Sequence, residues 1–247
     1  MKINLSENAA ELGERAAALT AKLLNEAIEK KGGARLVLST GASQFETIAA
    51  LVNKDVDWSY VEVFHLDEYV DLPITHPASF RKYIKERFQD KVNAKVINYV
   101  NTDGDISSNI ASLTKELRKA PVDVALIGIG ENAHIAFNDP PADFDNENAY
   151  IIVNLDEKCR KQQLGEGWFA TLEDVPKQAV SMTVKEIMKA KAIISSVPHA
   201  VKSQAIKETL ENDLTPNVPA TMLKQHANWN LFVDRNSASG VEIEKYL

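Results

Sequence analysis

Residues 122–141 read VDVALIGIGENAHIAFNDPP and hold the features that decide the fold. The apolar run 122–127 is short and partly β-branched, which predicts a strand buried on both faces of a parallel sheet. Glycines 128 and 130 end this strand. Ligands of open α/β sheets bind beyond the carboxyl ends of the strands, so a site is expected at the polar residues that follow: Glu131, Asn132, His134 and Asp139. The alternative is that the glycines only form a turn.

A second polar cluster, HLDEY at 65–69, favours a site, because it also follows an apolar strand, residues 61–64. Exposed carboxylates usually belong to a solvated surface. Two of them beside a His and a Tyr at a strand end are more typical of a functional site. Asp67 and Glu68 should point in opposite directions, since successive side chains of a strand alternate.

A third junction runs from the strand 36–38 through Ser39, Thr40, Gly41, Ala42 and Ser43 into a helix that begins near Phe45. Backbone N–H groups, hydroxyls and a helix N-terminus at such a junction can hold a phosphate. The sequence matches neither the Walker motif nor the dinucleotide fingerprint. An equal alternative is that Ser43 only caps the helix.

The rest of the chain alternates between strands and helices. Helices are expected at 6–31 with Ser6 as N-cap, at 79–90, from Lys185, and at 201–212 after Pro198; further strands are expected at 150–153, 179–184, 190–197 and 229–234. This alternation predicts an α/β fold with a doubly wound, mostly parallel sheet and helices on both faces. At 247 residues a single domain spanning 1–247 suffices.

Composition excludes several classes of function. The net charge of -7 and the pI of about 5.3 argue against a nucleic-acid partner, although a small anion can still be bound by local donors. Cys159 is the only cysteine, so no disulfide or thiolate metal cluster is expected. No apolar run approaches a membrane span, and a cytoplasmic location is the interpretation.

Several motifs together resemble the glucosamine-6-phosphate deaminase family: STGASQ, HLDEYVDLP, GIGENAHIAFNDPP, the helix with Lys202, and VPATMLKQHANWNLFVD. The related 6-phosphogluconolactonases usually read His-Thr-Ala-Ser-Leu-Phe after the glycines, so HIAFNDP favours the deaminase branch. The resemblance implies a Rossmann-like three-layer fold that converts an amino-sugar phosphate, most simply glucosamine 6-phosphate, into fructose 6-phosphate and ammonia. It implies no metal and no cofactor, and it leaves a homo-oligomer open.

The resemblance also implies roles for single residues. Asp67 is similar to the general base that moves a proton from C2 to C1, and His134 to the residue that opens the sugar ring. One histidine suits this work because imidazole both donates and accepts protons near neutral pH. Asp139 orients that imidazole. The phosphate-binding positions are Thr40, Gly41, Ala42, Ser43 and Lys202.

Some positions depart from the family pattern. Asn132 stands where many members have Asp, which removes a negative charge near His134 and with it support for the imidazolium. Ala133 replaces a common Gly and disfavours a left-handed backbone. Asp139 is one methylene shorter than the usual Glu. Gln163 lies about where some members place an arginine on the phosphate, and Arg160 is expected to be a solvated helix charge rather than its substitute.

Three functional hypotheses follow. The first is an enzyme, a glucosamine-6-phosphate deaminase-like hydrolase/isomerase, because both proton-transfer residues are present. The second is lactone hydrolysis at the same phosphate site, which needs no C2 base. The third is a sugar-phosphate sensor without turnover, which Asn132 and Ala133 keep open. The other histidines are expected to be structural or solvated: His65, His76, His199 and His226.

Overall fold

The computed structural model describes residues 1–165 and 167–247. Within that part of the chain the strands form one seven-stranded parallel sheet and one three-stranded antiparallel sheet. The seven strands lie in the order β1 (Lys2–Ser6), β10 (Trp229–Asp234), β9 (Ala192–Val197), β6 (Val124–Leu126), β2 (Ala34–Leu38), β3 (Val61–His65) and β5 (Val96–Asn98). The predicted Rossmann-like, doubly wound fold is confirmed.

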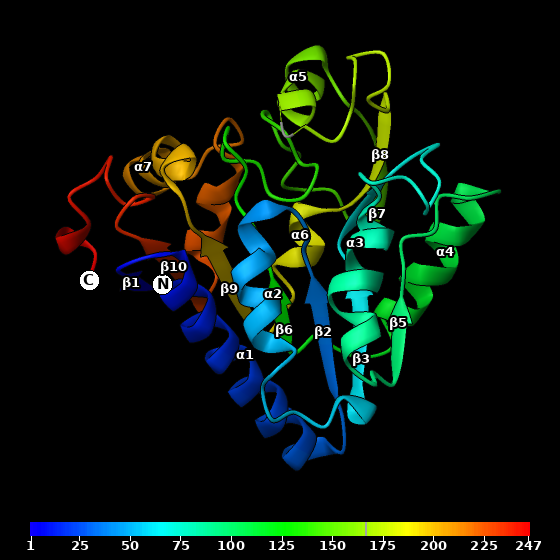
Figure 1. The fold of residues 1–247 in the computed structure, drawn as a ribbon, viewed down its shortest axis with the longest axis horizontal. Coiled ribbons are helices and arrows are strands. Elements are labelled where there is room, and N and C mark those ends of the chain that lie inside the picture. The colour runs from blue at the N-terminus through cyan, green and yellow to red at the C-terminus, as the bar shows by residue number, and fades with distance from the viewer. Residues whose placement is uncertain (166) are drawn as a thin grey trace.

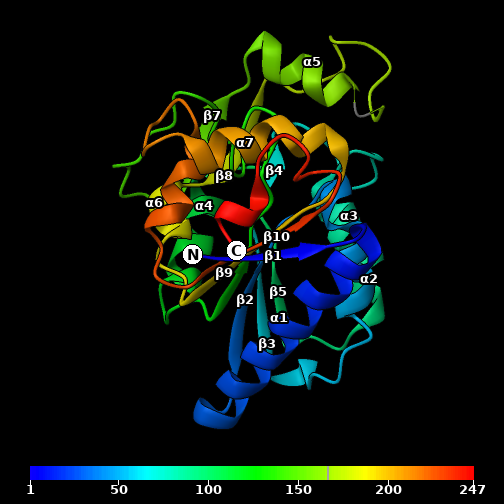
Figure 2. The same cartoon turned by 90° about the vertical axis from the view of Figure 1, so that its left-hand side faces the viewer.

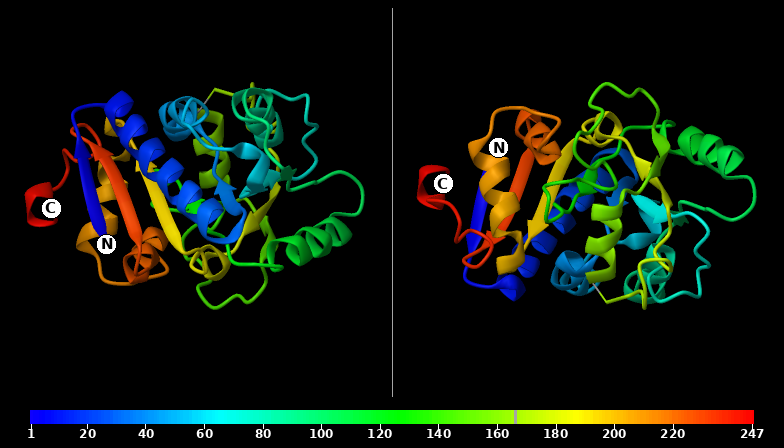
Figure 3. Two further views of the ribbon diagram at one scale, coloured as in Figure 1. Left: turned by 90° about the horizontal axis from the view of Figure 1, so that it is seen from below. Right: turned by 90° about the horizontal axis from the view of Figure 1, so that it is seen from above.

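Helices cover both faces of the parallel sheet (Figure 3). On one face lie α1 (Ala9–Lys31), α2 (Phe45–Leu51) and α3 (Phe80–Arg87), and on the other α4 (Ile106–Leu117), α6 (Val184–Ile187) and α7 (Ser203–Glu211). Neighbouring strand residues pack into different cores, because Leu36 and Leu38 join the core beneath α1 while Val37 joins the opposite one. This two-sided burial explains why apolar residues predominate in the central strands.

The smaller sheet contains β4 (Asp67–Tyr69), β8 (Gln178–Met182) and β7 (Tyr150–Asn154), in the order β4-β8-β7. Together with α5 (Glu157–Gly165) it lies beyond the carboxyl ends of the parallel strands (Figures 1 and 2). The sequence predicted β7 and β8 but neither β4 nor the separate sheet, because residues 67–69 were expected to follow the end of the strand 61–64. Nothing local to these strands specifies their pairing partners.

Two helix starts differ from the prediction. Helix α1 begins at Ala9, with the Asn8 side chain accepting from the Glu11 amide, because Ser6 is still paired with Asp234 at the end of β1. Helix α7 begins at Ser203, after a 3-10 turn at Ala200–Lys202, and not directly after Pro198. The predicted end of α1 at Gly32 is confirmed.

No helix in the described ranges is long and apolar enough to cross a membrane.

Candidate active site

The site lies where the strand order reverses. From β2 the chain proceeds outward through β3 and β5, then returns to β6 on the other side of β2 and proceeds to β9 and β10. The loops after β2 and β6 therefore diverge and leave a crevice, which is where α/β sheets bind ligands. A cavity of about 170 Å³ occupies this point, and it is lined by eight of the predicted residues: Thr40, Gly41, Ala42, Ser43, Asp67, Glu131, His134 and Lys202.

The loop after β2 depends on a glycine and on a buried glutamine. Gly41 has φ 97° and ψ 167°, a conformation that residues with a side chain rarely adopt. The Gln44 side chain holds the loop by donating to Ser43 Oγ at 3.0 Å and to the Ser196 carbonyl at 3.1 Å. Ser43 makes no capping bond to α2, so the capping alternative is wrong. The hydroxyl of Ser39 also lines the cavity, and in the described chain it is buried without a partner.

His134 packs against the backbone of Gly130. A Cβ atom on Gly130 would lie 2.2 Å from Cε1 of the imidazole, so only glycine leaves room for the ring. The Ala133 backbone is left-handed, with φ 61°, although the sequence disfavours that conformation there. The tight loop therefore carries strain that places the histidine beside the cavity.

Asn132 and Asp139 lie behind His134, outside the cavity lining. Asn132 Oδ1 is 2.6 Å from His134 Nδ1, Asn132 Nδ2 donates to Asp139 Oδ1 at 3.0 Å, and Asp139 Oδ1 is 3.1 Å from His134 Nδ1. Burial alone would raise the pKa of Asp139, but hydrogen bonds from His134, Asn132 and Cys159 outweigh it and lower the pKa to about 2. The imidazole thus rests against a carboxylate that stays ionised.

Asp67 faces the cavity from the start of β4, and only 6% of the residue is exposed. Burial, the larger cause, and the neighbouring Glu68 carboxylate together raise its pKa to about 8. Glu68 points away and lines no part of this cavity. Asp67 and Glu68 therefore point in opposite directions, as expected.

The third side of the cavity comes from the segment after β9 and from α5. Lys202 and His199 line it, and the His199 backbone has φ 78°, with its amide donating to the buried Asp234 carboxylate at 3.2 Å. Gln163 of α5 also lines it and accepts a hydrogen bond from the Tyr69 hydroxyl. Arg160 does not line the cavity. Its guanidinium donates to the carbonyls of Leu172 and Val175, so it is not the solvated helix charge that was expected.

Sequence reasoning missed Ser39 and Gln44 as parts of the site, and it placed His199 among the structural histidines. For Ser39 and Gln44 the signal was their position beside Thr40–Ser43. No sequence feature marked His199. Structural roles do hold for His65, which is fully buried, and for His226, whose ring bonds the Ala190 carbonyl and the Asn228 amide.

Comparison with known proteins identifies the class that this fold and site define. The model of the family described as glucosamine-6-phosphate isomerases/6-phosphogluconolactonase matches residues 7–232. The chain belongs to this family. It is 36% identical over 220 residues to a glucosamine-6-phosphate deaminase of Staphylococcus epidermidis, covering 85% of this chain and 89% of that one. It is 34% identical over 240 residues to one of Lactobacillus delbrueckii subsp. bulgaricus, covering 97% and 99%.

Solved structures agree on the fold. A monomeric glucosamine-6-phosphate deaminase superposes with a TM-score of 0.88 at 27% identity, covering 98% of this chain and all of that one. A 6-phosphogluconolactonase from Thermotoga maritima superposes with a TM-score of 0.77 at 18% identity, covering 94% and 99%. The lactonase likeness extends to the fold alone.

Proposed function

We propose that this protein, acting as a single domain over residues 1–247, converts glucosamine 6-phosphate and water into fructose 6-phosphate and ammonia. The observation that carries the proposal is that one cavity holds both a histidine with a fixed tautomer and a buried aspartate with a raised pKa. Isomerisation needs both groups, because protons move on oxygen during ring opening and on carbon afterwards.

His134 opens the ring. Since Asn132 directs its NH₂ to Asp139, its carbonyl oxygen faces His134, and the imidazole must donate from Nδ1. The lone pair is then on Nε2. Nε2 takes the proton from the O1 hydroxyl and delivers it to the ring oxygen as the C1–O5 bond breaks, which gives the open aldehyde. Asp139 keeps the imidazole oriented and stabilises its transient positive charge.

Asp67 moves the carbon-bound proton. It removes the proton from C2 and returns it to C1, while O1 gains a proton to become a hydroxyl and the C2 amine loses one to become an imine. Water then adds to this imine, and ammonia leaves to give the ketose. A base whose pKa lies near 8 holds the proton long enough to return it, which a carboxylic acid of ordinary pKa does less well.

The phosphate binds between Lys202 and the Thr40–Ser43 loop. Backbone amides beside Gly41 and the hydroxyls of Thr40 and Ser43 supply donors, and Lys202 supplies a positive charge. The Ser39 hydroxyl is a further donor at the same place. The sugar phosphate is the proposed partner, with no nucleic acid, no membrane and no cofactor required by this chemistry.

The assignment is to an isomerising deaminase. The matching family model covers both activities, but the lactonase structures are at or below 21% identical to this chain, and lactone hydrolysis would leave the raised pKa of Asp67 without a purpose. One set of assays separates the hypotheses: ammonia release from glucosamine 6-phosphate, hydrolysis of 6-phosphogluconolactone, and calorimetric binding of both. Ammonia release supports the proposal. Lactone hydrolysis alone, or binding without turnover, would overturn it.

A further inference from the structure

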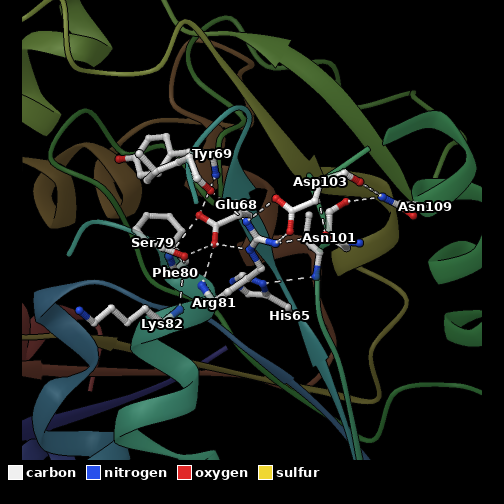
Figure 4. A network of polar contacts seen from close by, with 12 residues as sticks. His65, Glu68, Tyr69, Ser79, Phe80, Arg81, Lys82, Asn101, Asp103 and Asn109 are labelled. Atoms are coloured by element: carbon white, nitrogen blue, oxygen red, sulfur yellow. Dashed lines mark hydrogen bonds and ion pairs between the residues drawn. The ribbon is translucent and has the colours of Figure 1, made fainter. Parts of the chain in front are cut away.

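Glu68 is a fully buried carboxylate that the proposed mechanism does not use. It follows Asp67 in β4 and projects from the opposite side of the strand, toward the start of α3 (Figure 4). Burying a charge is costly unless hydrogen bonds replace the lost water. A carboxylate beside the base therefore calls for an explanation.

Four donors surround Glu68. Oε1 accepts from the amides of Tyr69 at 2.9 Å and Phe80 at 3.1 Å, and Oε2 accepts from Ser79 Oγ at 2.8 Å and the Arg81 amide at 2.7 Å. Arg81 Nε lies 3.4 Å from the same oxygen. Burial, the larger cause, raises the pKa of Glu68 above its ordinary value, although these donors act to lower it. Since the environment supplies donors only, it solvates the ionised form.

Asp67 is in the opposite situation. In the described part of the chain no donor contacts its carboxylate. When Asp67 and Glu68 hold one proton between them, that proton is therefore bound by Asp67. The Arg81 guanidinium lies 3.4 Å from Glu68 and also binds Asp103 at 2.7 Å near the surface, so the three groups together carry one net negative charge. The network of Figure 4 thus holds one fixed negative charge beside the base.

Other groups packed around the pair add no competing charge from the protein interior. Burial lowers the pKa of His65 to about 3 and raises that of Tyr150 well above its ordinary value, so both are neutral. The titratable or charged groups that line the cavity with Asp67 are Glu131, His134, His199 and Lys202.

We propose that Glu68 is a positioning residue: it ties β4 to the first turn of α3 so that Asp67 faces the sugar, and its carboxylate, held by four donors, favours a proton on Asp67 between C2 and C1. The part of this inference that concerns proton transfer by Asp67 rests on the proposed function. It needs no contact between Glu68 and the substrate, and it gives β4 two opposed carboxylates with two different tasks.

The first test is the pH dependence of kcat/KM for ammonia release by wild type, Glu68→Gln and Ser79→Ala. Gln keeps the shape of Glu68 and one acceptor but removes the charge. The ascending limb should move to lower pH by roughly one unit or more, because removing a unit negative charge from the neighbouring residue lowers the pKa of the buried Asp67. Ser79→Ala removes one of the donors and the N-cap of α3, so it should lower stability but keep the limb in place. An unmoved limb in Glu68→Gln contradicts the inference.

The second test does not use catalysis. The folded pKa of Asp67 is about 8 and the ordinary value is 3.8, so folding retains a proton that the unfolded chain releases. The stability from this group is complete below pH 4 and is lost as pH rises toward 8. Asp67→Asn abolishes that loss. The free energy of unfolding of the variant should therefore exceed that of the wild type by an amount that grows as the pH rises from about 4 to about 8.

In the Glu68→Gln background the same Asp67→Asn substitution should gain less, and the gain should level off at a lower pH. Urea unfolding of the four proteins between pH 4 and 9 measures this cycle. An equal gain in both backgrounds would show that Glu68 does not hold the proton on Asp67. If the wild type releases no ammonia, the proposed function fails, while the unfolding cycle still decides whether the two carboxylates are coupled.

Discussion

Asn132 Oδ1 lies 2.6 Å from Nδ1 of His134, so Asn132, at the position where the family resemblance implies Asp, contacts the imidazole. The contact is neutral on the Asn132 side. It therefore fixes the tautomer of the imidazole without adding a charge that favours its protonated form.

Asn132→Asp should make His134 bind a proton at a higher pH than in wild type, because a carboxylate at hydrogen-bond distance stabilises the imidazolium. The measurement is an NMR titration of the His134 Cε1 proton. Activity alone would not isolate this effect, since Asp67 titrates near pH 8. An unchanged titration midpoint would contradict the arrangement of Asn132, His134 and Asp139.

Asp67→Asn should reduce turnover by about 10²–10⁴-fold, the usual contribution of a general base, with little change in substrate binding. It should also stop exchange of the substrate C2 proton with deuterated water. Glu68→Gln is the neighbouring control and should still exchange that proton, at a shifted pH. Normal exchange in Asp67→Asn would place the base elsewhere.

Lys202→Ala should raise KM for the phosphorylated sugar about 10- to 100-fold and change kcat little, because a charge-assisted hydrogen bond contributes about 1.5–3 kcal/mol. The unphosphorylated sugar supplies the comparison. If the variant and the wild type have the same KM for glucosamine 6-phosphate as for glucosamine, Lys202 does not bind the phosphate.

Gly130→Ala should lower kcat by about 10²-fold or more, because the added methyl group overlaps the imidazole and displaces it by about an ångström. The matched control is Gly165→Ala, where the new methyl group meets nothing within 4 Å. Equal activity of both variants would mean that His134 can move aside without loss, and circular dichroism checks that both remain folded.

His199→Gly should raise the free energy of unfolding by about 1 kcal/mol, since φ 78° with ψ 146° is strained for any residue except glycine. His199→Ala removes the same imidazole but keeps the strain, so it should not gain stability. Urea unfolding compares the two. Because His199 lines the cavity, a rise in KM shared by both variants would show that the imidazole contacts the substrate.

The apolar pattern of the strands was enough to predict a parallel sheet and the edge of it at which Asp67 and His134 lie, because apolar runs and the polar residues after them are local features of the sequence. Three features could not be predicted in this way. The strands of the small sheet look like any others until their partners are known. Ser6 resembles an N-cap, but its pairing with Asp234 extends the strand through it. Gly130 was interpreted as the residue that ends the strand, whereas glycine is needed there because the His134 imidazole packs against its backbone.

The pairing of β1 with β10 has a consequence for how the protein is made. These strands are neighbours in the sheet, and Glu7 and Arg235 form an ion pair at 2.6 Å although 228 positions separate them. At synthesis rates of about 5–20 residues per second, the first strand emerges at least ten seconds before its partner. During translation the flank of β9 that β10 will cover remains an open sheet edge. The nascent protein is therefore most exposed to aggregation or chaperone binding just before its last strand is added.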